Sequence, residues 1–266
     1  MNMSDWNIGL CSWSLGNDLS LIERVKEETG ISHIQLHVRS EMGKENTSFI
    51  ESLLSGGWIV NSAMVSFEHE DYSTLQSIAA TGGIVPIQYR QQGIKKVKDA
   101  IDINTFYGIE MLSFHFGMIE SSDSQLIGQV REVADYAAEN NVVLLMETGQ
   151  ETVEELQNFL LVLDHSWVGV NFDPANMILY SKGEPVSAVN KLSSWIKNIH
   201  IKDAVSSTDE RLWGKEVAWG QGEVDSYGFF KALSDIGYKG DLCVERECGE
   251  NRLEDIITAI SSLRSF

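Results

Sequence analysis

The most constraining feature of this sequence is a repeated alternation of short apolar runs with longer amphipathic segments. The apolar runs have the length of β-strands, and the segments between them have the length and patterning of helices. Eight such units in 266 residues give about 33 residues per unit, a size that suits a closed barrel of eight strands and eight helices. Because strands that alternate with helices form parallel sheets, the sequence predicts an α/β fold, a single (β/α)8 TIM barrel.

The boundaries of the predicted elements follow from these runs. We predict strands at residues 7–12, 32–38, 58–65, 109–115, 142–147, 168–173, 197–202 and 240–245. Helices are predicted at residues 18–30, 44–55, 88–108, 121–141, 151–164, 187–198, 225–240 and 251–266. No linker or low-complexity tract interrupts the series, so residues 1–266 are predicted to form one domain. An open doubly wound sheet is the alternative, but its Gly-x-Gly-x-x-Gly signature does not follow the first strand.

The charge balance and the cysteine content narrow the classes of partner. The formal net charge is -19, which repels phosphate backbones and anionic membrane surfaces, so we expect neither nucleic acid nor a membrane as a partner. No apolar run approaches the length that spans a bilayer, and the N-terminus lacks the pattern of a signal peptide. Three cysteines without framework spacing indicate a reducing compartment, and the predicted localisation is cytoplasmic.

Several predicted strands carry polar side chains on one face. In the second strand Ile34 and Leu36 alternate with Gln35, and in the seventh Ile199 and Ile201 alternate with polar residues. Successive strand residues point to opposite faces, so in a barrel the apolar set faces the helices and the polar set faces the axis. Catalytic groups of such barrels lie at the carboxyl ends of the strands, so these polar faces predict a site at that rim.

Four consecutive strands place a metal-ligating residue type at or near their carboxyl ends, namely Glu147, Asp173, His200 and Glu245. A single glutamate at a strand end is usually solvated, and a single strand histidine is more often a hydrogen-bonded core residue. Together the four form a mixed oxygen and nitrogen donor set that suits Mn²⁺, Mg²⁺, Co²⁺, Fe²⁺ or Zn²⁺. Three neighbouring carboxylates repel one another, so the pattern predicts one divalent metal ion as their counter-charge.

The order of the motifs "METG", "NFDPANM", "NIHIKD", "WGQGEVD" and "CVERE" resembles the xylose isomerase-like TIM-barrel superfamily. The resemblance is to its sugar isomerase/epimerase branch, with ketose 3-epimerases, hydroxypyruvate isomerases, and inosose isomerases or dehydratases. It covers the whole chain and is most specific over residues 142–247. In that family a divalent metal is held by a Glu, an Asp, a His and a Glu from strands five to eight. These positions match Glu147, Asp173, His200 and Glu245.

The resemblance implies an isomerase or epimerase that moves a proton at the carbon next to a carbonyl group of a sugar. A metal-stabilised enediolate would be the intermediate, with Glu147 and Glu245 serving as ligands and as acid and base. Lys202 is predicted either to bind a substrate oxygen or to form an ion pair with one of these glutamates. The full set of predicted substrate-binding residues is Lys202, Asn176, His115, His37, Trp13 and Trp213.

Other residues near the predicted site have structural interpretations. Asn176 could cap the segment after Asp173 instead of contacting substrate, and Asp203, which points away from Lys202, is predicted to anchor a loop. The glycines of "WGQG" lack the spacing and the lysine of a phosphate-binding P-loop, so we expect them to shape the loop after the seventh strand. Asp225 has the position of a helix N-cap, and Gly237 and Gly240 are predicted to end the following helix.

Three alternative functions stay open at this stage. A metal-dependent dehydratase acting on a cyclitol-like or keto-sugar substrate would use the same groups and would differ by loss of water. A non-catalytic sugar-binding barrel would bind without exchange of the substrate's α-proton. An endonuclease IV-like hydrolase is disfavoured, because Asn176 stands where that branch has a histidine. Family members often assemble, so a homo-oligomer is also an expectation.

Overall fold

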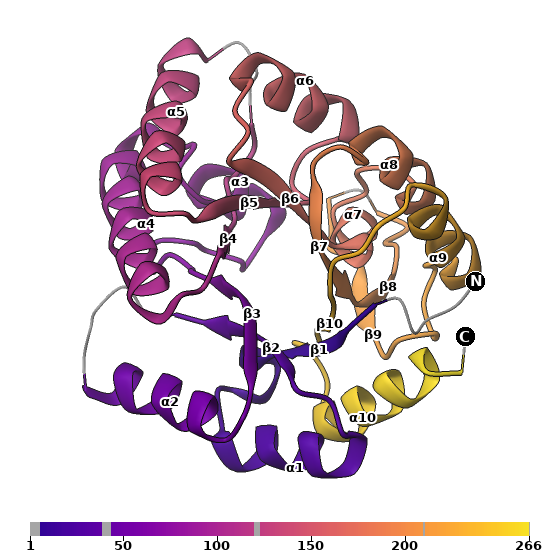
Figure 1. Ribbon diagram of the computed structural model, residues 1–266. Coiled ribbons are helices and arrows are strands. Elements are labelled where there is room, and N and C mark those ends of the chain that lie inside the picture. The colour runs from indigo at the N-terminus through magenta and orange to yellow at the C-terminus, as the bar shows by residue number, and fades with distance from the viewer. Residues whose placement is uncertain (1–5, 39–43, 120–122, 210, 266) are drawn as a thin grey trace.

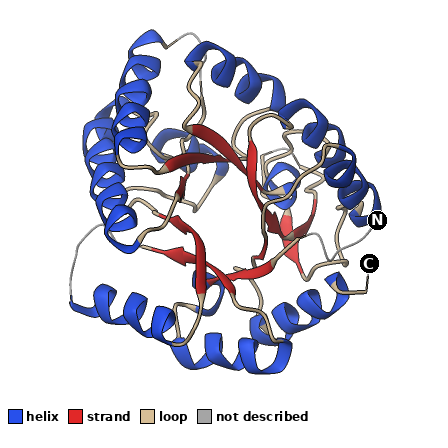
Figure 2. Cartoon of the chain, in the orientation of Figure 1, coloured by secondary structure: helices blue, strands red, loops and turns tan. Residues whose placement is uncertain are grey.

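The computed structural model describes residues 6–38, 44–119, 123–209 and 211–265. Eight parallel strands close into a barrel in the order β1-β10-β7-β6-β5-β4-β3-β2, with the helices forming an outer ring (Figures 1 and 2). The barrel strands are β1 (Ile8–Cys11), β2 (His33–His37), β3 (Ile59–Met64), β4 (Met111–Phe114), β5 (Val143–Glu147), β6 (Val168–Phe172), β7 (Ile196–Ile201) and β10 (Leu242–Val244). The predicted (β/α)8 barrel is therefore confirmed. That residues 1–266 form one domain stays a prediction.

The outer ring contains the eight predicted helices and additional short elements. The helices are α1 (Leu19–Thr29), α2 (Lys44–Ser55), α3 (Leu75–Thr81), α4 (Ile87–Tyr107), α5 (Ser124–Glu139), α6 (Val153–Leu163), α7 (Pro174–Leu179), α8 (Pro185–Leu192), α9 (Ser226–Asp235) and α10 (Arg252–Leu263). A 3-10 turn, η2 (Ser12–Leu15), follows β1, and a two-stranded antiparallel hairpin of β8 (Asp203–Val205) and β9 (Lys215–Val217) follows β7. The elements α3, α7, η2, β8 and β9 were not predicted, because each is too short to have a recognisable period.

Local hydrogen bonds explain where several helices begin. Asp18 accepts from the amides of Ser20 and Leu21 at the start of α1, and Asp225 accepts from Gly228 at the start of α9. These caps satisfy amide groups that a helix leaves without an internal partner. Gly237 lies just past α9 in the left-handed region with φ of +69°, as predicted for a helix end.

One predicted helix, residues 187–198, ends earlier than expected. The observed helix α8 begins at Pro185 and ends at Leu192, and residues from Ile196 onward belong to β7. In β7, Ile196 pairs with Val170 and Asn198 pairs with Asn171 of β6. Parallel pairing with β6 thus overrides the helical appearance of this segment, because the barrel closes only if β7 starts there.

The two faces of the strands divide as the alternation predicts. Ile34, Leu36 and Ile199 belong to the apolar core, whereas Gln35 and Asn198 are fully buried and bond to one another inside the barrel. The interior is therefore polar toward its carboxyl end. No helix in the described ranges is both long and apolar enough to cross a bilayer.

Candidate active site

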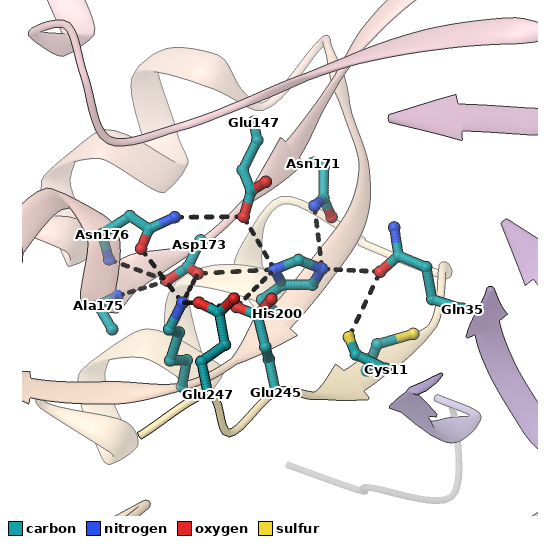
Figure 3. A network of polar contacts seen from close by, with 12 residues as sticks. Cys11, Gln35, Glu147, Asn171, Asp173, Ala175, Asn176, His200, Glu245 and Glu247 are labelled. Carbon is teal, nitrogen blue, oxygen red and sulfur yellow. Dashed lines mark hydrogen bonds and ion pairs between the residues drawn. The ribbon is translucent and has the colours of Figure 1, made fainter. Parts of the chain in front are cut away.

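Four side chains from adjacent strands converge at the carboxyl end of the barrel (Figure 3). Glu147 ends β5, Asp173 follows β6, His200 lies in β7 and Glu245 follows β10; all four are buried. The Nδ1 atom of His200 lies 3.1 Å from Glu147 Oε1, 3.5 Å from Asp173 Oδ2 and 3.3 Å from Glu245 Oε2. One ligand atom from each of the four residues lies within 4.8 Å of all the others.

The atoms that face one another in this cluster suit a divalent cation. Glu147 Oε2, Asp173 Oδ2, His200 Nδ1 and Glu245 Oε2 are buried, and apart from the ion-pair contacts with His115, His200 and Lys202 they have no hydrogen-bond partner among the described residues. Buried polar atoms without partners are rare and costly, so such a group calls for an explanation. Three carboxylate oxygens and one imidazole nitrogen are ligand atoms that Mn²⁺, Mg²⁺, Fe²⁺, Co²⁺ and Zn²⁺ accept. The residues present therefore fit the group that the resemblance implies.

The two carboxylate oxygens of Asp173 have different roles: one caps a helix and the other faces the cluster. Its Oδ1 accepts hydrogen bonds from the amides of Ala175 at 2.8 Å and Asn176 at 3.0 Å, which caps the short helix α7. Its Oδ2 makes no hydrogen bond and faces His200. Pro174 occupies the first helical position, where its fixed φ suits the start of a helix, and the two cap bonds to Oδ1 orient the carboxylate so that Oδ2 faces His200.

The far side of the His200 ring is held by amide side chains. The Nε2 atom lies 2.7 Å from Gln35 Oε1 and 3.0 Å from Asn171 Nδ2. A carbonyl oxygen can only accept, so the shorter contact places a proton on Nε2. In a neutral ring, the form that binds a metal, the lone pair is then on Nδ1, which points at the three carboxylates. Without a metal, burial lowers the pKa of His200 but the neighbouring carboxylates raise it well above its ordinary value, so the ring is then a cation.

Lys202 is a buried cation among carboxylates. Its Nζ lies 2.8 Å from Glu245 Oε2, 2.6 Å from Glu247 Oε2 and 3.7 Å from Asp173 Oδ2. Although burial raises the pKa of Glu245, the charges of Lys202 and His200 lower that pKa well below its ordinary value. The Glu245 carboxylate is therefore ionised near neutral pH. The ion pair predicted for Lys202 is present, and Lys202 also lines the cavity described next.

A cavity of about 580 Å³ opens above the cluster. This volume lies in the range of pockets that bind small molecules. All six residues predicted to contact substrate line it: Lys202, Asn176, His115, His37, Trp13 and Trp213. Among them Asn176 donates to Glu147 Oε1 at 3.2 Å, and His115 Nε2 lies 3.4 Å from Glu147 Oε2. That these six residues contact a substrate stays a prediction.

Aromatic rings form part of the cavity wall. Trp13, in η2 rather than at the end of a strand, donates from Nε1 to Glu245 Oε1 at 2.6 Å. The ring of Trp213 lies 4.8 Å from that of Tyr180 and 6.5 Å from that of Tyr72. By contrast, Trp219 is half-buried and packs against the hydrophobic core, so it is not a wall residue.

Asp203 holds the loop after β7 through hydrogen bonds to both of its carboxylate oxygens. Asp203 Oδ2 accepts from the amides of Gly220 at 3.0 Å and Gly222 at 2.9 Å, and its Oδ1 accepts from Val224 at 3.1 Å. A Cβ atom at Gly222 would lie 2.2 Å from Asp203 Oδ1, so this contact requires glycine. The "WGQG" segment therefore wraps around the Asp203 carboxylate, which confirms that Asp203 anchors a loop.

Glu216, on the hairpin strand β9, holds the segment that follows β10. Its Oε1 accepts from Arg246 Nη1 at 2.6 Å and from the amides of Glu247 at 3.0 Å and Cys248 at 3.3 Å. This bonding places the Glu247 carboxylate beside Lys202. The hairpin thus connects to the four-residue cluster through Glu247, Lys202 and Glu245.

Sequence reasoning did not identify several residues of this site. Gln35 was placed on the inward face without a role, although a polar residue in the middle of a strand is a usable signal. Glu247 lies two residues after Glu245, so continued alternation could have found it. No periodicity predicts Glu216, Tyr72 or Tyr180. Glu216 lies on the three-residue strand β9, and Tyr72 and Tyr180 lie outside the helices and strands.

Comparisons with known proteins agree with this fold. The family model described as "Xylose isomerase-like TIM barrel" matches residues 72–266. A xylose isomerase domain protein from Planctomyces limnophilus is 28% identical, with a TM-score of 0.88 over 98% of this chain and 96% of that chain. A xylose isomerase-like TIM-barrel protein from Mycobacterium smegmatis, solved with magnesium, is 17% identical with a TM-score of 0.70 over 99% of each chain, which shows the shared fold alone.

A protein of named activity also matches. An inosose dehydratase from Clostridium beijerinckii is 28% identical over 114 residues, which is 38% of this chain and 38% of the dehydratase. The alignment thus spans well under two thirds of that relative's length.

Proposed function

Because this chain belongs to the xylose isomerase-like TIM-barrel family, we propose that it is a divalent-metal-dependent isomerase or epimerase that acts on a sugar. The observation that carries the proposal is the buried cluster of three carboxylates and one imidazole beneath a cavity of substrate size. In this proposal Glu147, Asp173, His200 and Glu245 hold the metal. The donor set does not select among Mn²⁺, Mg²⁺, Co²⁺, Fe²⁺ and Zn²⁺.

When bound, the cation would polarise a substrate carbonyl group and stabilise the negative charge of an enediolate. Proton transfer is assigned to Glu147 and Glu245: one carboxylate removes a proton from the carbon next to the carbonyl, and the other, after it has taken up a proton from water, returns a proton to the carbon skeleton. Burial raises the pKa of Glu147, but His115 and His200 lower it below its ordinary value, as Lys202 and His200 do for Glu245. Both carboxylates are thus ionised near neutral pH, so either can accept a proton.

Two neighbours would hold Glu245 in place during the reaction. Trp13 donates to Oε1, and the ammonium of Lys202 lies 2.8 Å from Oε2. A carboxylate base held through both oxygens keeps a fixed direction toward the substrate carbon, which lowers the entropic part of the reaction barrier. Lys202 could also donate to a substrate oxygen as negative charge develops on it.

A dehydratase is the second candidate, and the similarity to an inosose dehydratase favours it. The same residues would remove the proton next to a ketone, and the hydroxyl group on the neighbouring carbon would leave as water. Mass spectrometry separates the two candidates, because an isomer has the mass of its substrate and a dehydration product is lighter by one water.

The experiment that tests the proposal combines metal analysis with solvent-deuterium uptake. Protein loaded with Mn²⁺ is incubated in D2O with a panel of ketoses, aldoses and 2-keto-myo-inositol, and the substrate carbon is followed by NMR. We expect deuterium at the carbon next to the carbonyl, and loss of uptake in Glu147→Gln and Glu245→Gln. Absence of uptake with every compound in metal-loaded protein would contradict the proposal.

Asp173→Asn provides a sharper test of the metal site. The asparagine keeps an oxygen that can accept from Ala175 and Asn176, so α7 stays capped, while the oxygen that faces His200 is replaced. We expect the variant to remain folded and to lose the thermal stabilisation that Mn²⁺ gives the wild type. Asp209→Asn, an exposed carboxylate paired with Arg211, is the matched control and should keep that stabilisation.

A further inference from the structure

The cavity presents many acidic side chains to a substrate and few cationic ones. The acidic residues that line it are Glu70, Glu147, Glu216, Glu245 and Glu247. Among the residues that the structure describes, Lys202 is the one lysine in the lining, and no arginine lines it. A divalent cation would not reverse this balance, because Glu147, Asp173 and Glu245 together carry three negative charges.

Lys202 and Arg246, the positive side chains that the structure describes in and behind the cavity wall, already have carboxylate partners. Lys202 is 3% exposed and is surrounded by Glu245, Glu247 and Asp173. Arg246, just behind the wall, donates to Glu216 at 2.6 Å and to Asp255 at 2.9 Å. These cations therefore have little capacity left for the two negative charges of a phosphate group.

The two histidines of the lining also have partners. His37 Nε2 lies 2.9 Å from Ser66 Oγ, and His115 Nε2 lies 3.4 Å from Glu147 Oε2. A protonated His115 would thus face a carboxylate of the proposed metal cluster before it could meet a substrate anion.

The backbone amides that could bind an anion are occupied in the same way. In many TIM barrels a phosphate is bound by amides of the loops after the seventh and eighth strands. Here the amides of Gly220 and Gly222, in the loop after β7, donate to Asp203. The amides of Glu247 and Cys248, in the segment after β10, donate to Glu216. The carboxylates of Asp203 and Glu216 thus accept the amide hydrogen bonds that an external phosphate would otherwise accept.

We infer that the cavity takes an uncharged polyhydroxy ketone or aldehyde, a free sugar or a cyclitol ketone, and rejects the corresponding phosphate ester. The carboxylates and amides of the wall accept and donate hydrogen bonds to hydroxyl groups, and the rings of Trp13, Tyr72 and Trp213 offer apolar faces to the carbon skeleton. Among the described residues no cation without a carboxylate partner lines the cavity beside Glu216 and Glu247, so a phosphate group there would lose affinity. This inference rests on the proposed function and adds the substrate class.

The test compares matched pairs of compounds: D-fructose with D-fructose 6-phosphate, and L-ribulose with L-ribulose 5-phosphate, with 2-keto-myo-inositol as a cyclic uncharged ketone. Solvent-deuterium uptake and binding by calorimetry are both measured on Mn²⁺-loaded protein. We expect the uncharged member to have a kcat/KM for uptake at least about 100-fold above that of its phosphate ester. Equal or preferred uptake of the phosphate esters would overturn the inference while leaving the proposed function intact.

The binding measurement separates the inference from the proposed function. Saturable binding of uncharged compounds without uptake would contradict the proposed function and still support the substrate class. Binding of neither class, or tighter binding of the phosphate esters, would overturn the inference. Inorganic phosphate serves as a simple anion probe and is expected not to compete with an uncharged ligand.

Glu216→Ala tests whether the Glu216 carboxylate keeps phosphate away from the donors that it occupies. The change frees Arg246 and the amides of Glu247 and Cys248, so binding of inorganic phosphate should appear and the discrimination against phosphate esters should fall at least about tenfold. Glu216→Gln keeps an oxygen that can accept these bonds and serves as the milder variant if the alanine variant does not fold. Unchanged discrimination in a folded Glu216→Ala protein would contradict the role given to this carboxylate.

Discussion

The carboxylate of Asp203 should be the strongest single support of the loop that carries the hairpin. It is 1% exposed and accepts hydrogen bonds from four backbone amides, those of Ala204, Gly220, Gly222 and Val224. A hydrogen bond to a charged acceptor contributes about 1.5–3 kcal/mol, and a buried amide left without a partner costs about 1–3 kcal/mol. Asp203→Ala removes all four bonds at once.

The size of the effect depends on which amides water can reach afterwards. Gly220 is exposed and Gly222 is half-buried, so water can replace the carboxylate there, whereas Val224 and Ala204 stay buried. Two fully lost bonds and two partly compensated ones give an expected loss of about 3–5 kcal/mol in the free energy of unfolding. In a domain of this size that corresponds to a Tm lower by roughly 5–9 °C.

Urea and thermal unfolding followed by circular dichroism measure this loss. Asp203→Asn keeps one accepting oxygen and should fall between the alanine variant and the wild type. Asp209→Ala is the matched control, because that carboxylate bonds to Arg211 and to its own loop at the surface and should change stability by less than about 1 kcal/mol. A loss under about 1 kcal/mol in Asp203→Ala would refute the reasoning from amide bonding.

Three further predictions concern other parts of the molecule. Gln35→Leu removes the acceptor of His200 Nε2 and should weaken Mn²⁺ binding about 10–100-fold in a calorimetric titration, whereas the exposed Gln92→Leu should not. Gly83→Ala should be destabilising by several kcal/mol in urea, because its Cβ would lie 2.2 Å from the Phe116 carbonyl carbon; at Gly237, where nothing lies within 4 Å, the cost should be about 1 kcal/mol. Burial raises the pKa of Glu151 from 4.5 to about 8, so its folded form favours the protonated state and its contribution to stability falls as pH rises from about 5 to 8. In Glu151→Gln the free energy of unfolding should fall by up to about 4 kcal/mol less over this pH range than in the wild type, as measured by urea unfolding at several pH values. Equal pH dependence of stability in the variant and the wild type would contradict the raised pKa of Glu151.

The barrel and the order of the site residues along it follow from the pattern of the amino-acid sequence. Eight apolar runs at regular spacing allow few other closed arrangements, and strand alternation assigns a face to each residue once the barrel is accepted. This is why Asp173, His200 and Glu245 could be placed on the inward face from the sequence. Glu147 could not be placed in the same way, because β5 is apolar on both faces and has no alternation to read.

The contacts that hold the site residues, and the side chains that surround them, become visible in the folded chain. The bond from Trp13 to Glu245 joins residues 232 positions apart, and the bonds of Glu216 to residues 246–248 join the short hairpin strand β9 to the irregular segment after β10. Such contacts depend on barrel closure and on side-chain direction, which local patterning does not encode. The same holds for the placement of Lys202 between Glu245 and Glu247, because only the distances reveal that its charge is already shared among carboxylates.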